Sequence, residues 1–324
     1  LPVIVMPLNV FVNERRLYLP CVAFCIGLAI AFSFVKQRRL QILPGLNLLA
    51  VLLLICFGTL VIQRNPVWAD DTSLWKDAVA KAPLMPRNHL YLGNVHKDLA
   101  FATSIAAEET RHWDAALDSY QRVIALGRDE ELALRALNNQ GSVYFSLGDM
   151  EAAERVYRES LRINPLYADA LINMGNVLVM RSRPVDSEEK RARVREAIVF
   201  FKKALEVSPN DKNAYGSLGV AYHDLADFDM AIKTYKRALA LDPWSPKNWK
   251  NLGGVHFQLG KTAIVESGSE LQVVREARKD LQKALAYYKK SLEYSPHYAD
   301  AALGRDQVGE LLRQVDEFLL QRDA

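Results

Sequence analysis

The chain has 324 residues, half of them apolar, and its 41 lysines and arginines against 38 aspartates and glutamates give a formal net charge of +3. That excess is too small to indicate a nucleic-acid-binding protein, and no basic run is interleaved with the aromatic side chains that such a surface needs, so we expect no nucleic-acid partner. The apolar residues are concentrated before position 63, and the rest of the chain is rich in the helix-favouring residues Ala, Leu, Glu, Lys and Arg. The sequence therefore predicts an all-α protein in which a lipid-facing region precedes a larger helical region.

Residues 1–63 are predicted to form a membrane region. Residues 1–12 are apolar but short, so we interpret them as the end of one span. Two longer apolar segments, at about 17–36 and 42–62, each approach the ~20 residues that a transmembrane helix needs. A hairpin buried in a globular core is the less favoured interpretation, because such cores rarely hold two charge-free runs of this length. We therefore expect a lipid bilayer as one partner of the chain.

A short basic loop separates the two predicted spans and sets their expected orientation. It contains Lys36, Arg38 and Arg39, and short loops of this kind tend to stay in the cytoplasm. The region after the second span would then face the periplasm, in a bacterial inner-membrane protein, or the lumen of the endoplasmic reticulum. Because the chain begins with Leu1 and has no basic-then-apolar leader, we expect it to be the C-terminal part of a longer protein.

Residues 64–83 form the junction between the two regions. Trp75, Ala78 and Pro83 occupy the places that an aromatic, a small residue and a proline take in the second helix of the repeats described below, so we interpret the junction as half a repeat. The acidic pair Asp70-Asp71 would suit a catalytic site outside the membrane, but carboxylates also stabilise the N-terminus of a helix, and we favour that role. No catalytic residue is predicted in this chain.

Residues 84–296 contain a pattern with a period of about 34 residues, which is typical of tetratricopeptide repeats. Each of five units has a glycine in its first helix and an aromatic residue in its second, and all units but the first have a closing proline. In chain order these residues are Gly93 and Tyr120; Gly141, Tyr157 and Pro165; Gly175, Phe201 and Pro209; Gly219, Tyr235 and Pro243; and Gly253, Tyr288 and Pro296. Inserts lengthen the third and fifth units, and we expect them to extend the second helices at their N-termini. Residues 297–324 supply one more helix, interpreted as a solubilising cap.

The first helix of each such pair lines a concave groove. Counting from the glycines places a set of amide and basic side chains on this face, with Asp169 as the one acid that we find there. The set is Arg87, Asn94, Lys97, Arg135, Asn138, Asn139, Asn173, Asn176, Asn213, His223, Lys247, Lys250 and Asn251. Because an amide can both donate to and accept from a peptide group, we predict that these residues bind an extended polypeptide, and the cations favour an acidic one. The alternative, that several of these asparagines only stabilise helix packing, stays open.

The histidines show no metal-binding or catalytic spacing. The six histidines are scattered along the chain, and His96 and His256 occupy an aromatic packing position of the repeat, which favours a place in the core. The sequence also has no phosphate-binding glycine-rich loop and no nucleophile elbow. We therefore expect neither a metal ion nor a cofactor.

Two short segments resemble a known family. They are Asn13-Glu14-Arg15-Arg16-Leu17-Tyr18-Leu19-Pro20 and Arg64-Asn65-x-x-Trp68 with the following Leu74-Trp75-x-Asp77. Together with the spans and repeats, they resemble the C-terminal half of the transmembrane and tetratricopeptide-repeat O-mannosyltransferases and their bacterial relatives. In that resemblance Glu14, Arg15, Tyr18 and Pro20 match a motif at the outer membrane face.

The resemblance implies a transferase that moves a sugar from a polyprenyl-phosphate carrier to Ser or Thr of an acceptor protein outside the cytoplasm, with the repeats presenting the acceptor. The family's catalytic acids lie in an early outward loop that this chain does not contain, so we do not expect this chain alone to catalyse. Our leading hypothesis is a membrane-anchored repeat region that binds polypeptide for such an enzyme. The alternative is a non-enzymatic repeat scaffold that assembles an envelope membrane complex.

Overall fold

A computed structural model describes residues 65–182, 188–267 and 270–323, together with Leu52, Ile55, Cys56 and Thr59. The two predicted spans, at 17–36 and 42–62, lie outside the described residues except at those four positions, and so does the whole motif of Glu14, Arg15, Tyr18 and Pro20. No helix in the described part of the chain is both long and apolar enough to cross a bilayer. The chain divides into two compact units, Leu1–Asp70 and Asp71–Ala324, and the first contains the short 3₁₀ helix Asn65–Trp68.

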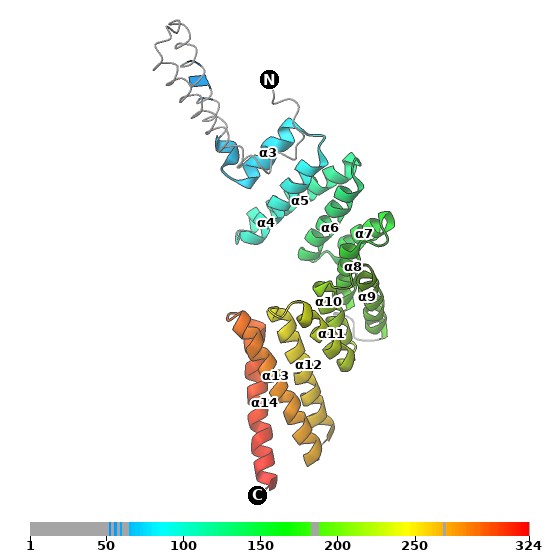
Figure 1. The fold of residues 1–324 in the computed structure, drawn as a ribbon, viewed down its shortest axis with the longest axis vertical. Coiled ribbons are helices and arrows are strands. Elements are labelled where there is room, and N and C mark those ends of the chain that lie inside the picture. Colours follow the sequence, from blue (N-terminus) through cyan, green and yellow to red (C-terminus); the bar gives the residue numbers. More distant parts are fainter. Residues whose placement is uncertain are drawn as a thin grey trace, which may run out of the picture. The chain divides into compact units, whose positions relative to one another are not determined.

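The second unit is built from α-helices stacked in sequence order (Figure 1), and α-helix is its only regular element between Asp71 and Asp323 outside the gaps at 183–187 and 268–269. The helices are α3 (Asp71–Lys81), α4 (Pro86–Ala102), α5 (Ala106–Leu126), α6 (Glu130–Ser146), α7 (Met150–Ile163), α8 (Ala168–Ser182), α9 (Glu188–Val207), α10 (Lys212–Asp224), α11 (Phe228–Leu241), α12 (Pro246–Ser267), α13 (Leu271–Tyr294) and α14 (Ala299–Asp323). The predicted all-α superhelix of helix pairs is confirmed.

The pairs are α4 with α5, α6 with α7, α8 with α9, α10 with α11 and α12 with α13. Each first helix also contacts the first helix of the next pair, whereas the second helices of successive pairs do not contact one another in the described part of the chain. The even-numbered helices from α4 to α12 therefore form one continuous surface, and these are the helices on which the sequence predicts the groove.

The repeated glycines are notches that receive the aromatic rings of the second helices. A Cβ atom added at Gly141 would lie 2.5 Å from Cε1 of Tyr157, and one added at Gly175 would lie 2.5 Å from Cε1 of Phe201. Tyr157 is 1% exposed and Phe201 is 0% exposed. Such a separation is well inside van der Waals contact, so only glycine allows the ring to pack against the backbone of the first helix.

The last pair departs from this frame. The sequence frame assigns Tyr288 to Gly253, but a Cβ at Gly253 would be 3.3 Å from this ring, whereas one at Gly304 of α14 would be 2.4 Å from it. Leu281 instead packs closely at Gly260, where an added Cβ would be 2.9 Å from its Cδ2 atom. Both helices of this pair are long, with 22 residues in α12 and 24 in α13. Their closest contact therefore lies at Gly260 and Leu281 rather than at the positions that the sequence frame assigns. Tyr288 thus joins the last pair to α14.

Aspartates fix where several helices begin. Asp149 accepts a hydrogen bond from the Ala152 N–H at 2.9 Å, and Asp211 accepts one from the Ala214 N–H at 2.9 Å. Each bond satisfies an N–H group that has no partner within its own helix. Asp211 therefore sets the position of α10, which carries part of the groove.

Candidate functional site

Asparagines on the first helices form hydrogen bonds from one repeat to the next. Asn139 of α6 donates from Nδ2 to Oδ1 of Asn94 on α4 at 2.9 Å, and Asn173 of α8 donates to Oδ1 of Asn138 on α6 at 2.8 Å. The Tyr120 hydroxyl also donates to Oδ1 of Asn94 at 2.9 Å. These four asparagines therefore stabilise the packing of successive repeats.

Packing does not use up their hydrogen-bonding capacity. A carboxamide has two N–H donors and an oxygen with two lone pairs. Asn138 and Asn173 share one bond, so in the described structure the nitrogen of Asn138 and the oxygen of Asn173 have no hydrogen-bond partner. Both residues also line a cavity on the groove face. The same side chains can therefore join the repeats and bind a ligand.

The cavity has a volume of about 500 Å³ and lies between α6, α8, α10 and α12; we call it the amide pocket. Its lining includes five residues of the predicted set, which are Asn138, Asn173, Asn176, Asn213 and Lys247. The lining also contains Asp169, Ile172, Asp211, Lys212, Gly216, Ser217, Ser245 and Asn248. Asp169 is thus not the one acid on this face, because Asp211 lies there too.

The other members of the predicted set lie outside this lining. Arg87 and Arg135 are exposed and Lys97 is half-buried. Lys250 lies 3.6 Å from Asp300, and Asn251 hydrogen-bonds Tyr235. His223 packs on Phe228 with 5.9 Å between the ring centroids, and burial lowers its pKa. The remaining two, Asn94 and Asn139, form the bond described above. The structure thus gathers the central part of the set into one pocket, and the binding role of the whole set stays a prediction.

Charges in the amide pocket are nearly balanced. The Lys212 ammonium lies 2.8 Å from the Asp242 carboxylate, and Asp211 is engaged at the start of α10. Lys247 has no ion-pair partner among the residues that the structure describes, and Asp169 hydrogen-bonds Tyr167. The pocket is therefore rich in amides and has no strong net charge.

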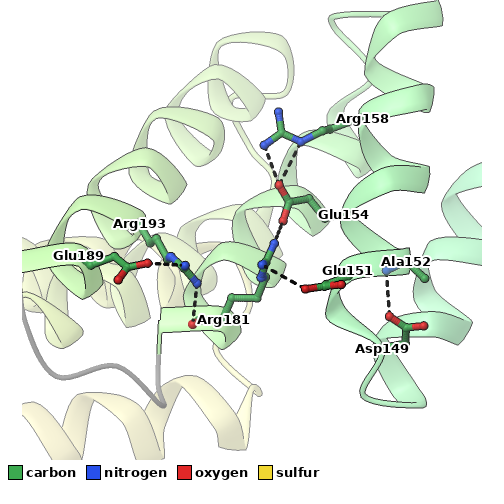
Figure 2. A network of polar contacts seen from close by, with 8 residues as sticks. All are labelled: Asp149, Glu151, Ala152, Glu154, Arg158, Arg181, Glu189 and Arg193. Carbon is green, nitrogen blue, oxygen red and sulfur yellow. Dashed lines mark hydrogen bonds and ion pairs between the residues drawn. The ribbon is translucent and has the colours of Figure 1, made fainter.

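A second polar cluster joins α7, α8 and α9 (Figure 2). Arg181 of α8 lies between Glu154 and Glu151 of α7, and Arg193 of α9 donates to the backbone carbonyl of Arg181 at 3.1 Å. Burial alone would raise the pKa of the Glu154 carboxyl, but hydrogen bonds from Arg158 and Arg181 outweigh burial and hold the pKa below its usual range. Since these charges satisfy one another, the cluster fixes neighbouring helices.

His96 and His256 lie in the core, as the sequence predicts, and are 7% and 6% exposed. The Nδ1 atoms of His96 and His112 are 3.1 Å apart, and His256 Nδ1 is 3.0 Å from an Asp280 carboxylate oxygen. Burial lowers the pKa of His96, and His112 and Lys76 lower it further. No group of three or more potential metal ligands occurs in the described part of the chain.

We expect the folded chain to lose stability as the pH falls from about 7.5 to 5.5. The pKa values of His96, His223 and His256 are all lowered, chiefly by burial, so the unfolded chain takes up protons at its ordinary histidine pKa of about 6.5 before the folded chain does. Urea unfolding at several pH values should show this loss, and His96→Gln should reduce it. His297→Gln provides the control, because it removes a histidine that is exposed in the folded chain. An equal pH dependence in the wild-type chain and in His96→Gln would contradict a role for His96.

Comparison with known proteins agrees with this architecture. Models of the tetratricopeptide repeat match residues 101–168 and 213–245. Human protein O-mannosyl-transferase TMTC3 is 24% identical over 268 residues, covering 78% of this chain and 27% of the human protein. Photosystem I assembly protein Ycf3 of Acaryochloris marina is 30% identical over 118 residues, covering 34% of this chain and 69% of that protein. The structure of TTC0263, a thermophilic TPR protein of Thermus thermophilus, matches with a TM-score of 0.52 at 22% identity and covers 69% of this chain and 98% of that one.

The structural match supports the fold of this chain, and the sequence matches support its relationship to the proteins named above. This chain spans about a quarter of the length of TMTC3. The alignment to TMTC3 covers most of this chain, including repeats that the family models do not reach. The chain belongs to the tetratricopeptide-repeat family and is a relative of the TMTC protein O-mannosyl-transferases.

Proposed function

We propose that the even-numbered helices bind an extended polypeptide segment in the amide pocket and along the adjoining asparagine row. The observation that carries this proposal is the pocket itself, in which amides from successive repeats line one cavity on the groove face. An extended backbone presents N–H and C=O groups at regular intervals, and carboxamides complement both. Such a groove holds the backbone of a segment without requiring one particular sequence.

Acidic residues in the segment should add to the affinity. Within the described structure, neither Lys97 nor Lys247 has an ion-pair partner, whereas Lys212 and Lys250 pair with Asp242 and Asp300. A carboxylate on the bound segment would complement the two unpaired ammonium groups. We assign the acidic preference to these two positions.

In the parent protein, the groove would present a polypeptide to an enzyme at a membrane. The relationship to proteins named protein O-mannosyl-transferase supports this role. Residues 1–63 would anchor the repeats in the bacterial inner membrane or the endoplasmic reticulum, with the groove facing the periplasm or lumen. Transfer of sugar from a polyprenyl-phosphate carrier to Ser or Thr would use a part of the parent outside this chain.

The role of the pocket is tested by Asn176→Ala combined with Asn213→Ala. Neither side chain makes a hydrogen bond to another described residue, so the double variant should unfold like the wild-type chain. Peptides selected by the wild-type chain from a random library should bind the variant about 5- to 30-fold more weakly, the loss expected for two hydrogen bonds. Fluorescence anisotropy of labelled peptides measures this change.

A matched control is Asn210→Ala, which removes an amide from the turn before α10, outside the pocket lining, where Asn210 bonds Arg237. This variant should keep the affinity of the wild-type chain. Equal peptide affinity in the double variant and the wild-type chain, or failure of the wild-type chain to select any peptide, would contradict the proposed function.

Lys247→Gln tests the acidic preference. For a selected peptide that carries a glutamate near Lys247, the variant should bind about 1.5- to 5-fold more weakly, which is the usual strength of an exposed ion pair, and added salt should weaken the wild-type complex more than the variant complex. Replacing that glutamate with glutamine in the peptide should produce the same loss with the wild-type chain. Unchanged affinity and salt dependence would exclude a role for Lys247.

A further inference from the structure

Two repeats carry an asparagine where the others carry alanine. Asn88 lies five residues before Gly93 and Asn248 five residues before Gly253, the glycines that the sequence frame assigns to their repeats. The same place holds alanine in α6, α8 and α10. Asn88 uses its amide inside the fold, because Nδ2 donates to the Ala78 carbonyl at 2.9 Å and to the Ala82 carbonyl at 3.4 Å. Asn88 therefore has a structural role at the start of the repeats.

Asn248 differs from Asn88 in its partners. It is only 7% exposed, it lines the amide pocket, and its side-chain amide makes no hydrogen bond to any residue that the structure describes. The oxygen and nitrogen of this amide are not among the fully buried polar atoms of the described structure, so they face the open space of the pocket and can each form a hydrogen bond there. Because Asn248 lines the pocket, a segment bound in the groove can supply this partner.

The floor of the pocket beside Asn248 is hollow. Gly216 lies three residues before the notch glycine of α10, and the same place holds Asn138, Ile172 and Lys250 in α6, α8 and α12. A Cβ atom at Gly216 would be 2.9 Å from Oδ1 of Asn248, so even a methyl group would crowd the amide. Glycine within a helix is unfavourable relative to alanine. The missing side chain leaves what we call the Gly216 hollow, with Asn248 on its wall.

The chemistry of the hollow favours an uncharged group that both donates and accepts. Asp211 and Lys212 are engaged elsewhere, and Lys247 is already assigned to a carboxylate of the segment, so the lining has no second unpaired cation for a charged side chain in the hollow. A carboxylate can only accept, which would leave the oxygen of Asn248 without a donor. A carboxamide can pair with both the nitrogen and the oxygen of Asn248.

We propose that the Gly216 hollow is a side-chain subsite that takes an asparagine or glutamine of the bound polypeptide and pairs it with the Asn248 amide. The proposal rests on the proposed function, since it requires that the groove binds polypeptide. It adds a sequence requirement at one position to a groove that otherwise contacts the backbone.

The experiment is a phage-display selection of random peptides of about ten residues, long enough when extended to cross several repeats, on the full 324-residue chain. It is repeated with Gly216→Ala and with Asn248→Ala. Two controls match them: Gly309→Ala, where an added Cβ has no atom within 4 Å, and Asn88→Ala. Urea unfolding of each variant checks that it is folded, and Gly216→Ala should fold well because alanine favours helix.

We expect the wild-type chain to enrich Asn or Gln at one fixed position of the selected peptides. Gly216→Ala and Asn248→Ala should lose this enrichment and keep the rest of the motif, and both controls should keep the enrichment. With a synthetic peptide from the selection, replacing that residue by Ala should weaken binding to the wild-type chain about tenfold but to Asn248→Ala less than about twofold.

Three results would overturn the subsite while leaving the proposed function in place: selected peptides with no preference for Asn or Gln, a preference for Asp or Glu at that position, or a preference that Gly216→Ala and Asn248→Ala retain. Selection of no peptide at all by the wild-type chain would overturn the subsite and the proposed function together.

Discussion

Replacing Phe201 with alanine is expected to lower the free energy of unfolding by about 3–5 kcal/mol, the usual loss for a large aromatic side chain removed from a packed core. Phe201 is 0% exposed and belongs to the largest core cluster, which extends from α7 to α12. Its ring lies in the notch at Gly175, so removing the ring leaves a cavity against the backbone of α8. Urea denaturation followed by circular dichroism measures the change.

Val199 provides the control for Phe201 on the same helix. It is 65% exposed, so Val199→Ala should change the free energy of unfolding by less than about 0.5 kcal/mol. If Phe201→Ala changed the free energy of unfolding as little as Val199→Ala, the helices α8 and α9 would not pack as described above. An unfolding transition that becomes less steep would show that the repeats no longer unfold together.

Two glycine-to-alanine substitutions are expected to have effects of opposite sign. In Gly175→Ala the new Cβ would be 2.5 Å from Cε1 of Phe201, so the ring must shift, and we expect a loss of about 1–3 kcal/mol. In Gly309→Ala of α14 the new Cβ meets no atom within 4 Å, so the higher helix propensity of alanine should stabilise the chain by up to about 1 kcal/mol. Urea midpoints of the two variants measure the difference.

This comparison separates the effect of crowding in the notch from the effect of helix propensity, because both substitutions add one methyl group within an α-helix. A stabilising Gly175→Ala would mean that the first helix does not contact the ring closely. A strongly destabilising Gly309→Ala would mean that α14 is packed on a face that the structure shows as open at this residue.

The repeat frame was predictable because its physical cause is local. A glycine in the first helix and an aromatic in the second recur at one period, and the notches at Gly141 and Gly175 hold the rings that the sequence assigns to them. The close contact of Tyr288 with Gly304 was not predictable from this frame. It depends on how two lengthened helices pack, and a sequence pattern gives helix positions but not the point where two long helices touch.

The amide pocket was predictable in part. The periodicity places Asn138, Asn173 and Asn176 on the first helices, and the structure brings them into one lining. The periodicity could not show which asparagines form hydrogen bonds with one another, because that depends on distances between repeats. Asn248 and Gly216 were missed, although aligning the repeats position by position shows an asparagine where alanine is usual and a glycine where a side chain is usual.

The most direct test of peptide binding on the even-numbered helices is hydrogen–deuterium exchange of the full chain with and without a selected peptide. Bound peptide should slow exchange in α6, α8, α10 and α12, which line the amide pocket, and leave α7, α9 and α11 unchanged. The Asn176→Ala, Asn213→Ala double variant should show weaker protection at the same peptide concentration. Protection confined to α7, α9 and α11, or no protection by a peptide that binds, would contradict the assignment of the groove.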